Sequence, residues 1–254
     1  MKDHLYTNHI IEEKMNIGGI PTLLLRPKDA KEPMPTLLFY HGWSSNKESQ
    51  RMRGFIYAAV GYQVFLPDAI YHGERNPIDY IPENGQYFWE AILKNMEESK
   101  LLTERIIQEF HGDPHKLFIG GSSMGGFTAA GVFTHNPQIK ALVVFNGSCA
   151  WRKSNVLLMK DNDLELKTKE KKTLERALEL DPMNHLEKLK DRDILMIHGD
   201  ADSSVSIESQ RLFFRKMQAL NKDKGRVKLI EYPNLNHYIT TNMMEDSIVW
   251  LKNR

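Results

Sequence analysis

The chain has 254 residues, with 34 lysines and arginines against 33 aspartates and glutamates. A net charge of +1 leaves no basic face for nucleic acid or an anionic membrane. No apolar run reaches the roughly 18 residues that a transmembrane helix needs, and the first residues, MKDHLYTNHI, do not read as a signal peptide. Since Cys149 is the single cysteine, no intrachain disulfide forms, and we expect one cytoplasmic domain over residues 1–254.

Predicted strands and helices alternate along the chain. Two apolar stretches, 9–17 and 20–27, flank a glycine pair and predict an antiparallel hairpin. Short apolar runs predict strands at 35–42, 62–68, 115–121, 140–147, 193–200 and 227–233. Apolar residues at helical spacing predict helices at 46–60, 87–110, 123–135, 205–220 and 239–251. Because the strands are apolar throughout, they indicate an α/β fold with a doubly wound, mostly parallel sheet.

One segment is longer than a doubly wound fold requires, the stretch between the strands at 140–147 and 193–200. Its centre, KDNDLELKTKEKKTLERALELDP, is rich in charge and helical in pattern. We expect residues 151–182 to form a small helical insertion at the edge of the sheet. It is either a lid that touches substrate, which is the favoured interpretation, or an inert surface helix.

Residues 120–126, GGSSMGG, stand between a predicted strand and a predicted helix. A sharp strand-to-helix turn holds its central residue at positive φ and presents that side chain at the carboxyl end of the sheet. The residues two before and two after must be small. Centring the turn on Ser122 would put Met124 at such a position, so the pattern predicts Ser123 as a nucleophile.

A serine nucleophile needs a base, and the base needs an orienting acid. Among ten histidines, His237 follows the last strand and precedes the last helix. In a doubly wound fold that loop lies at the same edge of the sheet as the nucleophile. Asp200 and Asp202 both follow the strand at 193–200. Asp200 is placed to cap the loop and Asp202 lies farther into it, so the pattern alone leaves both open as the acid.

Acyl transfer also needs N–H donors for the oxyanion. One is the N–H of Met124, directly after the nucleophile, and the other is expected from the loop after the strand at 35–42. Trp43 is the first choice there and Ser44 the alternative. The predicted substrate-binding residues are Trp43, His72, Trp89 and Trp151.

The loop LPDAIYHGERN contains Asp68, His72 and Glu74, but not at the spacing of a zinc site. We therefore expect no metal and no cofactor. The residues of this loop are expected to have structural roles, with Asp68 ending a strand and His72 starting a turn beside the oxyanion loop.

Five motifs, HGWSS, PDAIYHGER, GSSMGG, HGDADSSV and NLNH, occur in this order in the α/β-hydrolase superfamily. The chain most resembles the branch of dienelactone-hydrolase-like and prolyl-oligopeptidase-like esterases, and within it the small bacterial esterases of the YitV type, over roughly residues 20–250. In that branch the acid is the aspartate of a His-Gly-x-x-Asp-x-x-Val pattern, which is Asp202 here.

The resemblance implies a serine hydrolase that cleaves carboxylic esters of small to medium acyl or alcohol groups through an acyl-enzyme. A thioesterase, a lactonase and a short-peptide or amide hydrolase are alternatives with the same triad, and a non-catalytic binding protein is a further one. Dienelactone hydrolases use a cysteine where this chain has Ser123, and prolyl oligopeptidases carry a large propeller domain without a counterpart here. The expected partner is a small-molecule ester, bound by a monomer or homodimer.

Overall fold

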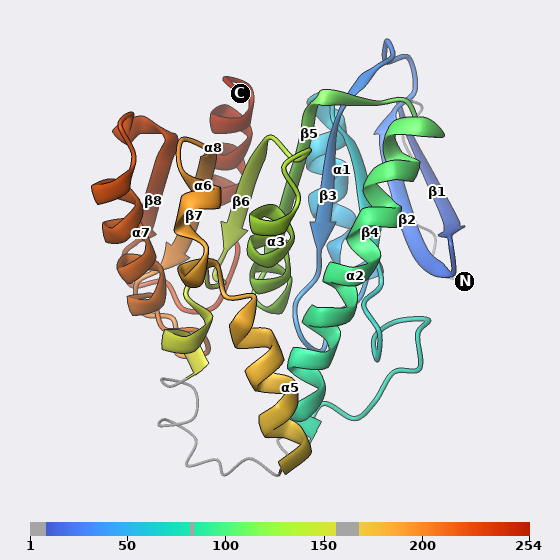
Figure 1. Ribbon diagram of the computed structural model, residues 1–254. Helices are drawn as coiled ribbons and strands as arrows, with labels where there is room; N and C mark the ends of the chain where they lie inside the picture. Colours follow the sequence, from blue (N-terminus) through green and yellow to red (C-terminus); the bar gives the residue numbers. More distant parts are fainter. Residues whose placement is uncertain (1–8, 82–83, 156–167) are drawn as a thin grey trace.

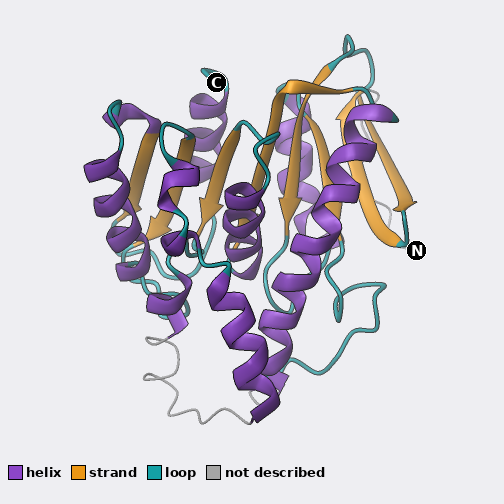
Figure 2. Cartoon of the chain, viewed as in Figure 1, coloured by secondary structure: helices purple, strands orange, loops and turns teal. Residues whose placement is uncertain are grey.

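Among the described residues, the fold is built on one eight-stranded sheet. The computed structural model describes residues 9–81, 84–155 and 168–254. Within them, strands pair in the order β1-β2-β4-β3-β5-β6-β7-β8, and Figure 2 shows the strands, in orange, side by side among the helices. The strands are β1 (Ile10–Ile17), β2 (Ile20–Pro27), β3 (Met34–Tyr40), β4 (Gln63–Pro67), β5 (Gly112–Ser122), β6 (Ala141–Phe145), β7 (Asp193–Gly199) and β8 (Val227–Tyr232). β1 pairs antiparallel with β2, and β2 with β4, whereas the other neighbours are parallel. The predicted hairpin and mostly parallel sheet are confirmed.

Helices cover both faces of this sheet. They are α1 (Arg51–Ala59), α2 (Gln86–Gln108), α3 (Met124–His135), α5 (Thr168–Glu179), α6 (Leu186–Leu189), α7 (Glu208–Leu220) and α8 (Thr241–Leu251), with short 3-10 turns η1 (Glu48–Gln50), η3 (Pro182–Asn184) and η4 (Lys224–Arg226). In Figure 1, α2, α3 and α7 lie in front of the sheet, and α1 and α8 lie behind it. The helix predicted at 46–60 is the turn η1 followed by the shorter α1.

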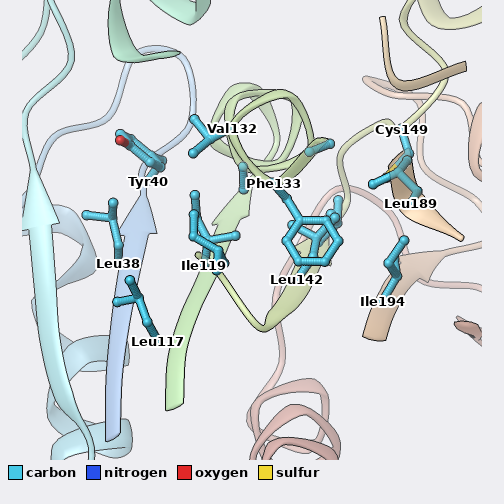
Figure 3. Packing of buried hydrophobic residues seen from close by; sticks show 14 of the residues in the cluster. Leu38, Tyr40, Leu117, Ile119, Val132, Phe133, Leu142, Cys149, Leu189 and Ile194 are labelled. Atoms are coloured by element: carbon cyan, nitrogen blue, oxygen red, sulfur yellow. The ribbon is translucent and has the colours of Figure 1, made fainter. Parts of the chain in front are cut away.

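Because helices cover both faces of the sheet, its central strands are largely apolar. Every residue of β4 and β6 is buried, because helices exclude water from both of their faces. On the front face, α3 packs over the centre of the sheet, and Figure 3 shows Val132 and Phe133 of this helix against Ile119 of β5 and Leu142 of β6. None of the described helices is both long and apolar enough to cross a bilayer.

The carboxyl ends of the parallel strands meet at one edge, the lower edge of the sheet in Figure 1. The loops after β3, β5, β7 and β8 gather there, which is where open α/β sheets bind ligands. These are the loops to which the sequence pattern assigns the nucleophile, acid, base and oxyanion donors. The fold therefore brings segments more than a hundred residues apart to a single edge.

The helix α5 lies below this edge, beside the first half of α2 (Figure 1). Arg176 Nη2 of α5 lies 3.0 Å from Glu97 Oε1 of α2, and Ala177 and Leu178 join an apolar cluster that includes Trp89. The predicted insertion at 151–182 thus contains a helix, but its residues 156–167 lie outside the described residues. Its role as a lid stays a prediction.

The close approach of α3 to the segment after β6 generates a stability prediction. A Cβ atom at Gly131 would lie 2.6 Å from Cη2 of the buried Trp151 and 2.7 Å from Sδ of Met96. We expect Gly131→Ala to lower the free energy of unfolding by about 1–3 kcal/mol through overpacking, despite a gain in helix propensity of about 1 kcal/mol. Urea unfolding measures this. In a Trp151→Phe background the same substitution should cost less, and an equal cost in both backgrounds would contradict this explanation.

Candidate active site

Ser123 occupies the turn between β5 and α3 in a backbone conformation that few residues adopt. Its φ is 53° and its ψ is −123°, a strained combination for a residue with a side chain. The backbone is held on both sides, because Ser123 N donates to Phe145 O of β6 at 3.0 Å and Ser123 O accepts from Gly126 N at 2.8 Å. The positive φ expected at the centre of GGSSMGG is therefore found at Ser123.

The glycines around Ser123 are required for clearance. A Cβ atom at Gly121 would lie 2.1 Å from Gly125 O, and one at Gly125 would lie 2.1 Å from Tyr40 O. Both obstacles are backbone atoms, so a side chain at either position would force β3, β5 and α3 apart. These are the positions two before and two after Ser123. The spacing of the small residues thus follows from how closely the helix approaches the strands.

Asp202 meets His237 directly in the loops after β7 and β8. Asp202 Oδ2 lies 2.7 Å from His237 Nδ1, and the Asp202 side chain is 0% exposed. Asp200, the other candidate acid, is exposed and accepts a hydrogen bond from Asn234 N at 2.7 Å instead. Of the two aspartates that the sequence pattern leaves open, the structure brings Asp202 to a histidine and uses Asp200 to cap a turn.

A second imidazole also contacts Asp202. His198 Nε2 lies 3.2 Å from Asp202 Oδ2 and 2.8 Å from the Val205 carbonyl oxygen, which accepts only, so Nε2 carries the proton. Burial alone raises the pKa of Asp202, but hydrogen bonds from His198, His237 and the Val205 N–H outweigh it and hold that pKa below its ordinary value. The sequence pattern predicts no role for His198. The one feature that could have indicated a role is its position four residues before Asp202.

His237 is held through Nδ1, and its Nε2 has no hydrogen-bond partner within the part of the chain that the structure describes. Its Nδ1 faces the Asp202 carboxylate and donates to it, and its backbone N donates to Asn236 Oδ1 at 2.7 Å. The side chain is 26% exposed. The structure contains no hydrogen bond between Ser123 Oγ and His237, as is common for catalytic contacts before a substrate binds. Asp202 and His237 are thus bonded to each other, whereas Ser123 has no hydrogen bond to His237 in this structure.

The loop after β3 borders Ser123 on the opposite side. A Cβ atom at Gly42 would lie 3.3 Å from Ser123 Cβ. The buried His41 fixes this loop, because its Nε2 accepts from Ala69 N at 3.0 Å and its Nδ1 donates to Gly42 O at 2.8 Å. Burial lowers the pKa of His41 to about 4, so the ring is neutral, as that pattern of one acceptor and one donor requires.

The two predicted oxyanion donors lie on either side of this contact. Met124 begins α3, where the first N–H groups of a helix have no partner within it. Neither Met124 N nor Trp43 N donates a hydrogen bond to any described residue. Ser44, the alternative to Trp43, is exposed and has a φ of 57°. The geometry leaves Trp43 and Ser44 both available as the second donor.

A buried ion pair supports the loop after β3. Lys47 Nζ lies 2.7 Å from Asp68 Oδ2 and also contacts Glu74 Oε1, while Lys47 N donates to Asp68 Oδ1 at 2.8 Å. Burial lowers the pKa of Lys47, but the two carboxylates outweigh it and raise that pKa above its ordinary value. Asp68 therefore joins the loop after β4 to the loop after β3. Its partner lies 21 residues away in the sequence, which no local pattern indicates.

Aromatic rings form one wall beside this loop. The Trp43 ring centroid lies 5.0 Å from that of His72, 5.3 Å from that of Tyr80 and 6.0 Å from that of Phe88. His72 is fully buried and donates from Nδ1 to Ile70 O at 2.8 Å. Of the group, Trp43, Tyr80 and Phe88 keep exposed surface, whereas His72 lies beneath them.

The two other tryptophans predicted to bind substrate lie deeper. Trp89 is 8% exposed and its ring centroid lies 5.5 Å from that of Trp151. Trp151 is 0% exposed and donates from Nε1 to Ser148 O at 3.1 Å. Trp151 thus has no surface with which to touch a substrate in this structure. It packs against α3 at Gly131, which is the physical reason for its burial.

A cavity that Ser123 does not line lies near the same edge of the fold. It measures about 420 Å³ and runs between α2 and α5, beside the loop after β4. Its lining residues are Ile70, Tyr71, Glu90, Leu93, Lys94, Glu97, Lys172, Thr173 and Arg176. None of the predicted site residues is among them. Over the described ranges, no three histidine, cysteine or acidic side chains gather as metal ligands would.

The chain is similar to several known proteins. The model of the prolyl oligopeptidase family matches residues 92–251. YjfP of Escherichia coli (strain K12), described as an esterase, is 30% identical over 94% of this chain and 97% of its own. YitV of Bacillus subtilis (strain 168) is 27% identical with the same coverage. Among solved structures, TT1662 from Thermus thermophilus has a TM-score of 0.79 at 21% identity, covering 96% of this chain and 97% of that one.

The family match spans α2 to α8 and includes the Ser123 turn, the Asp202 loop and the His237 loop. The structural match covers the N-terminal strands as well, and at its level of identity it shows the fold alone. The order of the strands, with antiparallel strands at one edge of the sheet and parallel strands beyond them, is typical of the α/β-hydrolase fold. The chain therefore belongs to the prolyl oligopeptidase family and has the α/β-hydrolase fold.

Proposed function

We propose that the chain is a serine hydrolase that cleaves carboxylic esters of small to medium acyl or alcohol groups. The observation that carries the proposal is the buried Asp202 carboxylate bonded to His237 at 2.7 Å, at the sheet edge where Ser123 is held at positive φ. A serine hydroxyl is a poor nucleophile unless a base takes its proton, and this pair supplies an oriented base. Family membership and the description of YjfP as an esterase support the same reaction class.

In the first half of the reaction, Ser123 Oγ attacks the ester carbonyl carbon and its proton passes to His237 Nε2. The tetrahedral oxyanion accepts hydrogen bonds from Met124 N–H and Trp43 N–H. Collapse breaks the carbon–oxygen bond to the alcohol, which leaves with the proton from His237. Water then attacks the acyl-enzyme while His237 takes its proton, and the second collapse returns that proton to Ser123.

The rate enhancements that this mechanism requires are within the usual range for such groups. General base action by His237 contributes about 10²–10⁴-fold, and each oxyanion donor about 10²–10³-fold. Asp202 stays ionised because its pKa is held below its ordinary value, so it fixes the imidazole tautomer and stabilises the imidazolium that forms. Because the same triad serves thioesters, lactones and amides, the choice of an ester rests on the relatives and on the aromatic wall around Trp43.

In the proposed enzyme, residues 1–254 form one domain, and the insertion at 151–182 acts as a lid. Support comes from α5, which packs over the apolar cluster that contains Met124 and Trp89. A lid in this place would shield the acyl group from water. Of the four substrate-binding residues predicted from the sequence, the proposed contacts are Trp43, which is half-buried, and Trp89, which keeps 8% of its surface exposed. His72 supports the Trp43 ring from below.

The nucleophile is tested by a pair of neighbouring substitutions. Ser123→Ala should lower the turnover of a short p-nitrophenyl ester by at least about a thousandfold, because it removes the attacking oxygen. Ser122→Ala is the matched control, since it deletes the same atom one residue earlier, and it should leave turnover near the wild-type value. Circular dichroism checks that both variants fold. Wild-type turnover in Ser123→Ala would reject the mechanism.

The acid is tested in the same way. Asp202→Asn should lower kcat by up to about 10⁴-fold, because an amide cannot hold the required imidazole tautomer or stabilise the imidazolium. Asp200→Asn serves as the control, because Asp200 is exposed and contacts no histidine among the described residues. Steady-state kinetics with the same ester measures both. Equal losses in the two variants would show that the acid is not Asp202.

The depressed pKa of Asp202 also predicts a pH dependence of stability. Because the folded-state pKa lies below the unfolded value of about 3.9, the stabilisation is fully present above that unfolded value and is lost as the pH falls toward the folded pKa. The stability advantage of the wild type over Asp202→Asn should therefore shrink between about pH 5 and about pH 3. Urea unfolding at both pH values measures it, and an advantage that grows at the lower pH would contradict the assignment.

A further inference from the structure

The side chain of a single asparagine joins the acid and base loops of the proposed triad, and its chain neighbours contact the nucleophile turn. Asn146 follows β6, which lies between the nucleophile strand β5 and the acid strand β7. It has a φ of 45° and is 2% exposed. Asparagine tolerates positive φ better than most residues, because its short polar side chain compensates locally. A buried polar residue in this conformation must find partners for its amide.

The partners of Asn146 lie in the two loops that carry the acid and the base. Its Nδ2 donates to Tyr238 O at 2.8 Å, directly after His237 in the chain. Its Oδ1 accepts from Gly199 N at 3.0 Å, at the start of the loop that holds Asp202. Both hydrogen bonds use the side-chain amide, so one residue satisfies a donor of one loop and an acceptor of the other.

These two loops already hold each other. Ala201 N donates to Leu235 O at 3.1 Å, and Ser203 N donates to Asn236 Oδ1 at 2.9 Å. A Cβ atom at Gly199 would lie 2.2 Å from Leu235 O, so the two backbones are in close contact. The loops after β7 and β8 therefore form one unit, which carries both Asp202 and His237. The position of this unit relative to Ser123 must be set by other contacts.

The neighbours of Asn146 contact the nucleophile turn. Phe145 O accepts from Ser123 N at 3.0 Å, and a Cβ atom at Gly147 would lie 2.9 Å from Gly126 Cα and 3.1 Å from Ser123 O. Residues 145–147 are thus packed against the turn, while the side chain between them reaches the other two loops.

Among residues 9–81, 84–155 and 168–254, the bond from Asn146 Nδ2 to Tyr238 O is the one hydrogen bond that ties the loop of His237 to the strand beside Ser123. Because Ser123 and His237 share no hydrogen bond of their own, their separation is set by such indirect contacts. The geometry points to Asn146 as a positioning residue that fixes the distance between the base and the nucleophile. This inference rests on the proposed serine-hydrolase function.

A positioning role predicts a loss in turnover without a loss in binding. Asn146→Gly removes both side-chain hydrogen bonds and keeps the positive φ without strain, since glycine adopts that conformation freely. We expect kcat to fall by about tenfold to a hundredfold, the usual cost of a small misplacement of reacting groups. KM should stay close to the wild-type value, because Asn146 is buried and its side-chain hydrogen bonds involve no residue of the aromatic wall.

A second variant separates the two hydrogen bonds. Asn146→Asp keeps an oxygen to accept from Gly199 N but replaces the donor to Tyr238 O with an acceptor. We expect kcat to fall at least as far as in Asn146→Gly, with KM again unchanged. Since the aspartate has the same shape as the asparagine, this variant also provides the test if the glycine variant does not fold.

The matched control is Asn221→Ala. Asn221 is equally buried and accepts a hydrogen bond from Asp191 N at 3.0 Å, at the opposite end of β7 from the triad loops. We expect Asn221→Ala and the Asn146 variants all to lower the melting temperature, because each loses a buried hydrogen bond, but Asn221→Ala should leave kcat at the wild-type value. If kcat falls equally in Asn221→Ala, the effect of the Asn146 variants is general destabilisation, and the inference is rejected.

Steady-state kinetics with a p-nitrophenyl ester and thermal unfolding of the full chain complete the experiment. Wild-type kcat in either folded Asn146 variant would overturn the positioning role, as would a rise in KM that accounts for the whole loss. The Ser123→Ala variant is measured alongside. If Ser123→Ala abolishes turnover and the Asn146 variants do not lower it, the proposed function stands and the positioning role falls.

Discussion

The close approach of α3 to the strands around Ser123 is the constraint on which the rest of the site depends. Gly121 and Gly125 leave no room for a side chain, and the obstacles are backbone oxygens that cannot rotate away. Helix and strand therefore meet at van der Waals distance, and Ser123 is forced to a φ of 53°. Such strain persists only where surrounding structure overdetermines it. Here the hydrogen bond from Ser123 N to Phe145 O supplies part of that support.

Because Ser123 is held rigidly, the acid, the base and the oxyanion donors must be positioned around it by their own loops. Buried polar contacts help to secure the loops that carry these groups. Asp202 receives hydrogen bonds from two imidazoles and backbone amides, and Asp68 binds both the backbone and the ammonium of Lys47. Each such group is costly to bury unpaired. Each of these two sets of contacts is therefore stable as a whole and intolerant of losing one member.

The features that the sequence predicted are those with a local signature. The alternation of apolar runs gives the mostly parallel sheet, and the spacing of glycines places Ser123 at the turn. The preference for Asp202 over Asp200 came from a family pattern, because loop position alone leaves two equivalent carboxylates. The contact from Asn146 to Tyr238 spans 92 residues and that from Lys47 to Asp68 spans 21. Pairings of that range are fixed by the strand order, which no local periodicity encodes.

The burial of Trp151 is another feature that local sequence patterns do not predict. Its position after β6 puts it at the correct edge of the sheet, but its depth depends on Gly131, which lets the indole pack directly on α3. A larger residue at Gly131 would have pushed the ring outward. Edge and depth are thus separate properties. Topology determines the first, and side-chain volumes on another element determine the second.

The position of Trp43 links specificity to turnover. Its ring packs against His72, Tyr80 and Phe88, while its backbone N–H is the proposed oxyanion donor. A substrate group that displaces the ring also moves that N–H, and an oxyanion donor is effective only within a few tenths of an ångström of its ideal distance. Poorly fitting acyl groups would then bind and still react slowly. Discrimination in this site would appear in kcat as well as in KM, because one residue serves both the wall and the oxyanion.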